Sequence, residues 1–172
     1  YQFDAVSTGV HRKRAILLSP TGSGKSLIIY ALLRWYLHNH DEKKCLIIVP
    51  TTSLVEQLTN DFKEYGMDSE NMVHKIYSGK DKVTNRRIIV STWQSIYKLP
   101  KQWFSQFGVV FGDECHGFKS KSLMSIMNKA TEAEYRFGTT GTLKPSSPSS
   151  LAHSEFIGVR YYFTNNLSEP SN

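Results

Sequence analysis

The sequence predicts an α/β domain with a mostly parallel central sheet and helices on both faces. Short apolar runs rich in β-branched residues alternate with longer segments in which apolar residues recur at helical spacing. The short runs are nearly continuous, which is typical of strands covered on both faces. A length of 172 residues suits one domain. We place this domain at residues 1–165 and expect residues 166–172 to form a tail or linker.

The apolar runs predict the strands. Most are four to six residues long and end near glycine, proline, serine or threonine, where a loop begins. The predicted strands are residues 15–18, 45–49, 72–77, 87–91, 108–112 and 135–139, with a weaker seventh at 161–163.

Helical periodicity fills the intervals between these strands. Ile28, Leu32 and Trp35 share one helix face, and Leu58 and Phe62 share another. A proline separates two shorter helical segments later in the chain. The predicted helices are residues 24–39, 53–65, 93–97, 102–107 and 121–131.

Composition limits the partners and the compartment. A net charge of +6 fits a polyanion such as nucleic acid, because basic side chains release counterions from phosphates, although many basic domains bind none. The longest apolar stretches are far shorter than the roughly 20 residues of a membrane span, so we expect no membrane partner. Cys45 and Cys115 lie too far apart to indicate a disulfide framework or a zinc site, which favours a reducing compartment. The N-terminus lacks a signal-peptide pattern, and we expect the chain to be an internal part of a longer protein.

A phosphate-binding loop is indicated at residues 19–26, between the first predicted strand and the first predicted helix. Glycines there allow positive φ angles and let backbone N–H groups approach an anion. Lys25 would bind the β- and γ-phosphates, and the Ser26 hydroxyl would bind Mg²⁺. The first position is serine where glycine is usual, and the alternative is a glycine-rich turn that caps a helix. The expected ATP-binding residues of the loop are Thr21, Gly22, Ser23, Gly24, Lys25 and Ser26.

Two adjacent carboxylates follow the predicted strand at 108–112. Ligands of open α/β sheets bind at this end of the strands. Asp113 would hold Mg²⁺, Glu114 would orient and deprotonate the attacking water, and His116 would sense the γ-phosphate. Alone, this four-residue pattern also fits an acidic turn with an exposed histidine. Paired with the upstream loop, it predicts ATP hydrolysis with Lys25, Asp113 and Glu114 as catalytic residues.

These motifs resemble those of superfamily 2 helicases of the DExH branch, in their first RecA-like domain, which has the P-loop NTPase fold. Residues 19–26 resemble motif I, 50–57 motif Ia, 113–116 motif II and 140–142 motif III, while 89–94 resemble a strand-end motif that touches the tracking strand. The resemblance implies that Gln2 reads adenine. It also implies that His116, Thr140, Gly141 and Thr142 couple hydrolysis to movement, and that nucleic acid is contacted by Pro50, Thr51, Thr52, Gln57, Ser91, Thr92, Trp93 and Gln94.

Two alternatives stay open for these contacts. Thr51, Thr52 and Gln57 also fit a helix cap and a solvated helix face. Trp93 also fits a core aromatic, because tryptophan buries well without stacking on a base.

Within that branch the chain is similar to bacteriophage helicases that remodel branched DNA by fork regression, junction migration and R-loop unwinding, in recombination and DNA repair. The resemblance implies DNA as partner, with RNA in hybrids, and a second RecA-like domain with an arginine finger, which this chain lacks. It also implies a cytoplasmic protein (host cytoplasm if phage-encoded) whose ATP-binding half alone is nearly inactive. The alternatives are a duplex-DNA translocase of restriction or chromatin-remodelling type and a nucleotide-gated binding module, against which an intact Glu114 argues.

Overall fold

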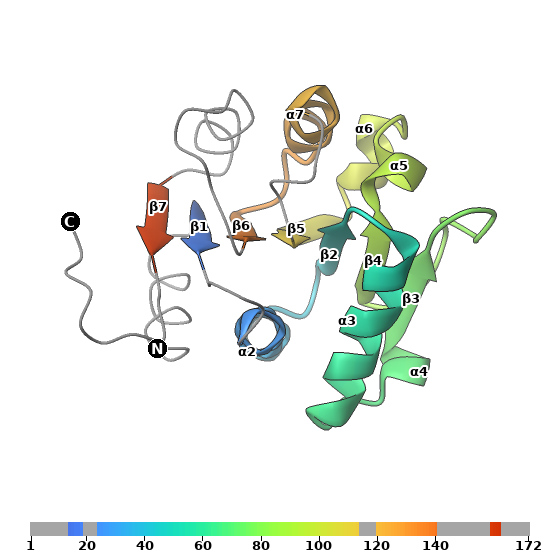
Figure 1. Ribbon diagram of the computed structural model, residues 1–172. Helices are drawn as coiled ribbons and strands as arrows, with labels where there is room; N and C mark the ends of the chain where they lie inside the picture. Colours follow the sequence, from blue (N-terminus) through green and yellow to red (C-terminus); the bar gives the residue numbers. More distant parts are fainter. Residues whose placement is uncertain (1–13, 19–23, 114–119, 141–158, 163–172) are drawn as a thin grey trace.

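A computed structural model describes residues 14–18, 24–113, 120–140 and 159–162, which form one seven-stranded sheet with helices on both faces (Figure 1). The strand order is β3-β4-β2-β5-β6-β1-β7, and every described pair is parallel. The strands are β1 Arg14–Leu18, β2 Lys44–Val49, β3 Val73–Ile76, β4 Ile88–Thr92, β5 Phe107–Asp113, β6 Tyr135–Thr140 and β7 Val159–Tyr162. The helices are α2 Lys25–Asn39, α3 Thr52–Glu64, α4 Ser69–Met72, α5 Trp93–Ile96, α6 Lys101–Phe104 and α7 Ser120–Lys129.

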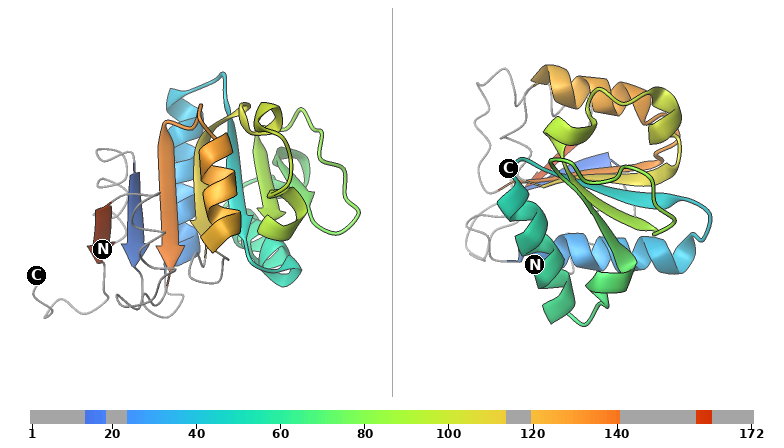
Figure 2. Two further views of the ribbon diagram at one scale, coloured as in Figure 1. Left: turned by 90° about the horizontal axis from the view of Figure 1, so that it is seen from above. Right: turned by 90° about the vertical axis from the view of Figure 1, so that its right-hand side faces the viewer.

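The sheet separates two apolar layers (Figure 2). On one face α2 and α3 pack through Ile29 and Phe62, and on the other α5, α6 and α7 pack through residues such as Phe104. Alternate residues of β2 serve the two layers, so that Ile47 joins the first and Ile48 the second. A strand whose side chains pack into apolar layers on both faces of the sheet needs apolar residues at every position. This explains the continuous apolar runs of the sequence.

The predicted fold class is confirmed, and each of the six main predicted strands is present with ends shifted by at most one residue. Phe107 was expected to end a helix, but it begins β5, where its side chain is fully buried. Helix α4 was not predicted, because a single turn of polar residues shows no periodicity. The weak seventh strand is found as β7, while Phe163 and the boundary at residue 165 lie outside the described residues.

One close contact fixes the distance between α2 and the start of β5. A Cβ atom added at Gly108 would lie 1.9 Å from the hydroxyl oxygen of Tyr36. A side chain at this position would force its neighbours to shift, so glycine is favoured there by space rather than by backbone conformation. Within the described parts of the chain, no helix combines the length and apolarity that a membrane span requires.

Candidate nucleotide-binding site

The candidate site lies at the carboxyl edge of three neighbouring strands. β5, β6 and β1 are adjacent and parallel, so their C-terminal ends reach the same edge of the sheet. Asp113 is the last residue of β5 and pairs in register with Thr139 of β6. β1, which directly precedes the predicted phosphate loop in the sequence, lies on the other side of β6. The sheet order therefore brings together two motifs that are far apart in the sequence.

Gly24 and the first turn of α2 position the lysine of the loop. Gly24 has φ 94° and ψ −2°, a left-handed conformation that glycine adopts without steric cost. Its carbonyl oxygen accepts the first helical hydrogen bond, from the amide of Ile28 at 2.9 Å. Lys25 and Ser26 thus lie at the positive end of the α2 dipole, where anions bind favourably. The expected positive φ is confirmed at Gly24.

Lys25, Ser26 and Asp113 line one small hollow of about 150 Å³. The side chains of Lys25 and Asp113 are almost fully buried, at 8% and 7% exposure. Charged side chains are seldom buried this deeply unless they are paired or belong to a binding site. Helix α3 closes the other side of the hollow with Leu54, Gln57, Leu58 and Asp61.

Thr139 orients the Asp113 carboxylate. Its hydroxyl donates a hydrogen bond of 2.7 Å to Asp113 Oδ1, and both side chains are buried. Hydrogen bonds to an ionised carboxylate are shorter and stronger than neutral ones. A hydroxyl and a fixed carboxylate are hard oxygen donors of the kind that Mg²⁺ prefers, so Ser26 and Asp113 fit a magnesium site. No sequence motif identified Thr139 as a site residue, although it directly precedes residues 140–142, which resemble motif III.

Two side chains of the α3 region hold the Ser26 hydroxyl. Ser26 Oγ and the Tyr65 hydroxyl are hydrogen-bonded at 2.7 Å. Burial raises the pKa of Asp61, a hydrogen bond from Ser26 opposes this rise, and the charges of Glu64 and Asp113 add to it. No local sequence pattern marks Asp61 or Tyr65, because their place beside Ser26 depends on how α3 packs on α2.

The predicted nucleic-acid residues lie around the C-terminal ends of β2 and β4, which are adjacent strands. They belong to the turn after β2, to α3, to the end of β4 and to α5. The side-chain amide of Gln94 donates to the carbonyl oxygen of Pro50 at 3.1 Å and joins α5 to the turn after β2. The Thr51 hydroxyl accepts a hydrogen bond from the Leu54 amide at 3.2 Å, so the helix-cap alternative is confirmed for this residue. Thr52 and Gln94 are exposed at this edge.

Two other predicted contacts, Ser91 and Thr92, are buried residues of β4. Ser91 is fully buried, and its hydroxyl donates to the backbone carbonyl of Thr92 at 2.8 Å. Thr92 is 5% exposed, and its hydroxyl is bonded to that of Ser95 at 2.7 Å. Neither side chain reaches a nucleic acid on the surface. Trp93 is partly buried and packs against the second apolar layer, which leaves both of its alternatives open. Gln57 is exposed and lines the hollow beside Lys25.

Several expected site residues lie outside the described residues, and for Thr140 only the backbone at the end of β6 is described. Those outside are Gln2, Thr21, Gly22, Ser23, Glu114, His116, Gly141 and Thr142.

Comparison with known proteins assigns the family. The family described as "Type III restriction enzyme, res subunit" matches residues 1–145. The chain belongs to this family. The "ATP-dependent DNA helicase uvsW" of Enterobacteria phage T4 is 43% identical over 163 residues, 92% of this chain and 32% of that protein. The "DNA 3'-5' translocase XPB2" of Sulfurisphaera tokodaii is 30% identical over 142 residues, 83% of this chain and 30% of that protein.

The fold agrees with that assignment. The crystal structure of the UvsW helicase from bacteriophage T4 matches with a TM-score of 0.87 and 40% identity, over 94% of this chain and 58% of that one. The expected resemblance to superfamily 2 helicases and the RecA-like fold are thereby confirmed. The chain spans about a third of the length of the curated relatives it matches.

Proposed function

We propose that this chain is the ATP-binding half of an ATP-dependent DNA helicase or translocase that uses Mg²⁺. The proposal rests on one observation: Lys25, Ser26 and Asp113, from distant segments, line a single hollow at the carboxyl edge of the sheet. The hollow of about 150 Å³ is smaller than the roughly 300–1,000 Å³ of sites for whole drug-sized ligands. The described residues therefore suit the phosphate end of a nucleotide and its metal ion.

Each residue has a defined part in the proposed hydrolysis. Lys25 neutralises the β- and γ-phosphates, and the α2 N-terminus adds partial positive charge. Ser26 and Asp113 would hold Mg²⁺, which would supply positive charge beside the phosphates. Thr139 keeps the Asp113 carboxylate in one orientation. Glu114, the next residue in the chain, orients the water and accepts its proton.

DNA would lie across the edge formed by the loops after β2 and β4, near Thr51, Thr52 and Gln94. Contacts there would be to the backbone and would carry little sequence preference. A second RecA-like domain would complete the ATP site with an arginine finger, and hydrolysis would change the angle between the two domains. His116 and residues 140–142 would transmit that change. The proposal places the whole protein in the cytoplasm, or in host cytoplasm if a phage encodes it.

For the substrate we propose branched DNA, remodelled by fork regression, junction migration or R-loop unwinding. The 43% identity to the T4 UvsW helicase supports this choice. The alternative of translocation along duplex DNA without strand separation is supported by the relative named a DNA 3'-5' translocase. Fork-regression and duplex-translocation assays on the complete protein distinguish the two: reversal of a model fork supports the first, and translocation alone supports the second.

The experiment that tests the proposed chemistry compares two substitutions in the complete protein. Lys25→Ala is expected to abolish ATP binding, because it removes the charge that faces the phosphates. Glu114→Gln is expected to retain binding and to lose DNA-stimulated turnover. Equal loss of binding in both variants would contradict the separate roles. A wild-type protein that binds ATP without DNA-stimulated hydrolysis would instead be a nucleotide-gated binding module.

A further inference from the structure

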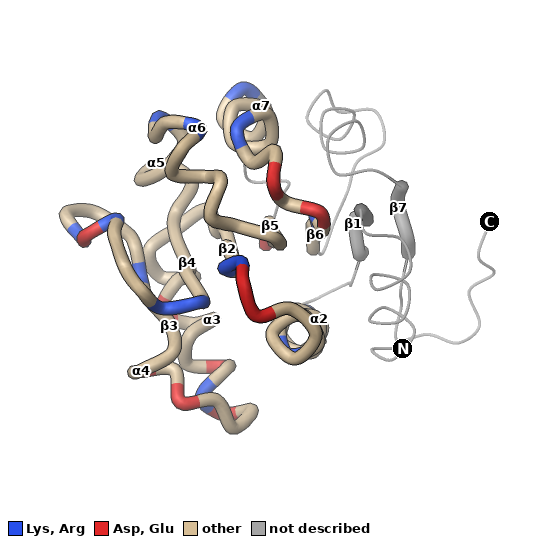
Figure 3. The backbone as a smooth tube through the Cα atoms, turned by 180° about the vertical axis from the view of Figure 1, so that it is seen from behind, with Lys and Arg blue, Asp and Glu red and all other residues tan. Residues whose placement is uncertain are grey.

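A basic hollow of about 470 Å³ lies at the opposite, amino edge of the sheet. Arg34 and His38 line it from the C-terminal half of α2, and Arg86 and Arg87 line it from the segment that leads into β4. Figure 3 marks the lysine and arginine positions along the backbone. No aspartate or glutamate is among its described lining residues, and part of the lining is apolar. The remaining lining residues are Leu37, Asn71, Met72 and Ile88.

Two of these arginines are held in place by backbone carbonyls. The Arg87 Nη2 donates to the carbonyl oxygens of His40, at 2.5 Å, and Lys43, at 2.9 Å. The Arg86 Nη1 donates to the carbonyl oxygen of Val73 at 2.8 Å. A guanidinium has five N–H donors, so each of these groups keeps donors beyond those bonds. Fixed guanidinium groups lose little entropy when they bind an anion.

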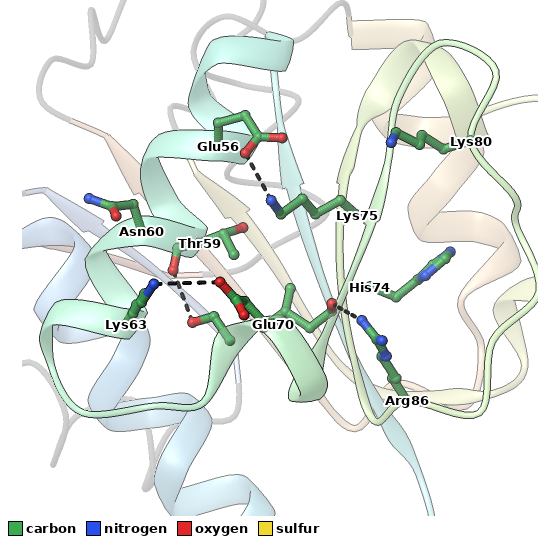
Figure 4. Close-up of a pocket in the computed structure, with 11 residues that line it drawn as sticks. Glu56, Thr59, Asn60, Lys63, Glu70, His74, Lys75, Lys80 and Arg86 are labelled. Carbon is green, nitrogen blue, oxygen red and sulfur yellow. Dashed lines mark hydrogen bonds and ion pairs between the residues drawn. The ribbon is translucent and has the colours of Figure 1, made fainter.

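Arg86 also lines a second hollow, of about 420 Å³, between α3 and β3 (Figure 4). Lys63, Lys75, Lys80 and His74 line this second hollow. Lys80 follows the C-terminal end of β3, so this hollow extends toward the carboxyl edge.

The two carboxylates of the second hollow are already paired. Glu56 accepts hydrogen bonds from Lys75 at 2.8 Å and from Tyr77 at 2.7 Å, and it holds its charge because these contacts lower its pKa. Glu70 lies 3.5 Å from Lys63. Lysine and arginine side chains outnumber these two carboxylates in the lining, so the second hollow carries net positive charge. A line of basic groups thus joins the edge proposed for DNA to the amino-edge hollow.

We propose that the amino-edge hollow binds backbone phosphates of a second nucleic-acid segment, one that leaves the carboxyl edge and passes along α3 and β3. This inference rests on the proposed DNA-dependent function. A nucleic acid repeats its charge along the chain, and two basic hollows joined by one arginine suit such a polymer better than a single small anion. A branched DNA would supply the second segment as a separate arm.

The test uses Arg34→Glu in the complete protein, with Lys101→Glu as control. Arg34 and Lys101 are both exposed and helical, and both substitutions replace a positive charge with a negative one, but α6 packs on the opposite face of the sheet. Binding to a three-way branched DNA and to a single-stranded oligonucleotide is measured across a salt series. Arg34→Glu is expected to weaken branched-DNA binding about tenfold and to lower the salt slope by about 1 to 2. Single-strand binding, single-strand-stimulated ATPase and the circular dichroism spectrum should not change.

Three results would overturn the inference. Equal effects of Arg34→Glu and Lys101→Glu would mean that only overall charge matters. If Arg34→Glu weakened the binding of both DNAs equally, no separate arm would be bound. If Arg34→Glu weakened the binding of ATP in the absence of DNA, and DNA binding were unchanged, the hollow would be a site for a small ligand. Arg34→Lys, which keeps the charge, should retain most of the branched-DNA affinity. Failure of the proposed function is recognised separately, since the wild-type protein would then show no DNA-stimulated ATPase.

Discussion

Replacing Thr139 with valine would remove the hydroxyl that orients Asp113 and would preserve the shape of the side chain. The bond is 2.7 Å long, and the two side chains are 1% and 7% exposed, so water has little access to replace it. Hydrogen bonds to charged groups contribute about 1.5–3 kcal/mol. We therefore expect Thr139→Val to lower the free energy of unfolding by about 2 kcal/mol. Loss of a partner behind a metal ligand typically costs about 10- to 100-fold in activity or metal affinity.

The assay is DNA-stimulated ATP hydrolysis by the complete protein as a function of Mg²⁺ concentration, alongside urea unfolding. Thr139→Ser keeps the hydroxyl and should retain most of the activity. Thr59→Val is the matched control, because the Thr59 hydroxyl is also buried but donates to a neutral carbonyl within α3, at 2.7 Å from Val55 O. It should leave the Mg²⁺ dependence unchanged. An unchanged Mg²⁺ requirement and turnover in Thr139→Val would refute the orienting role.

Three further predictions concern the Ser26 hydroxyl, Gly108 in β5 and the chain as a whole. Tyr65→Phe removes the hydrogen bond that competes with the metal ion for the Ser26 hydroxyl. The affinity for Mg·ATP in equilibrium titrations should therefore rise about two- to tenfold, and a fall in affinity would contradict this competition. Gly108→Ala should lower the free energy of unfolding in urea by about 1–3 kcal/mol, because its Cβ atom would clash with the Tyr36 hydroxyl. Adding Tyr36→Phe should recover part of this loss, and strictly additive effects of the two substitutions would exclude the clash. The isolated 172-residue chain should hydrolyse ATP about 10³- to 10⁵-fold more slowly than the complete protein, and comparable rates would show that no second domain is needed.

The strands and the main helices were predictable because burial on two faces leaves a clear pattern. β2 and β5 are apolar at nearly every position, and α3 concentrates its apolar residues on one side. The strand, the left-handed glycine and the helix around the predicted phosphate loop were predictable for another reason: Gly24, Lys25 and Ser26 are contiguous and are identified together.

Contacts between distant segments left no such pattern. Thr139 reaches Asp113 only because β5 and β6 are adjacent in register, and Tyr65 reaches Ser26 only because α3 packs on α2. Motif resemblance also placed Ser91 at a strand end without indicating orientation. Because β4 is buried at all five of its residues, the Ser91 side chain faces the interior. The basic hollow at the amino edge likewise combines Arg34 with residues far along the chain.

The most direct test is a crystal structure of the complete protein with Mg²⁺ and a non-hydrolysable ATP analogue. The predicted result has Lys25 Nζ in contact with the β- and γ-phosphates, and Mg²⁺ held between Ser26 Oγ and the Asp113 carboxylate, directly or through water. The hydrogen bond between the Ser26 and Tyr65 hydroxyls should then be broken. A nucleotide bound elsewhere, or phosphates out of reach of both Lys25 and Asp113, would contradict the proposed ATP site.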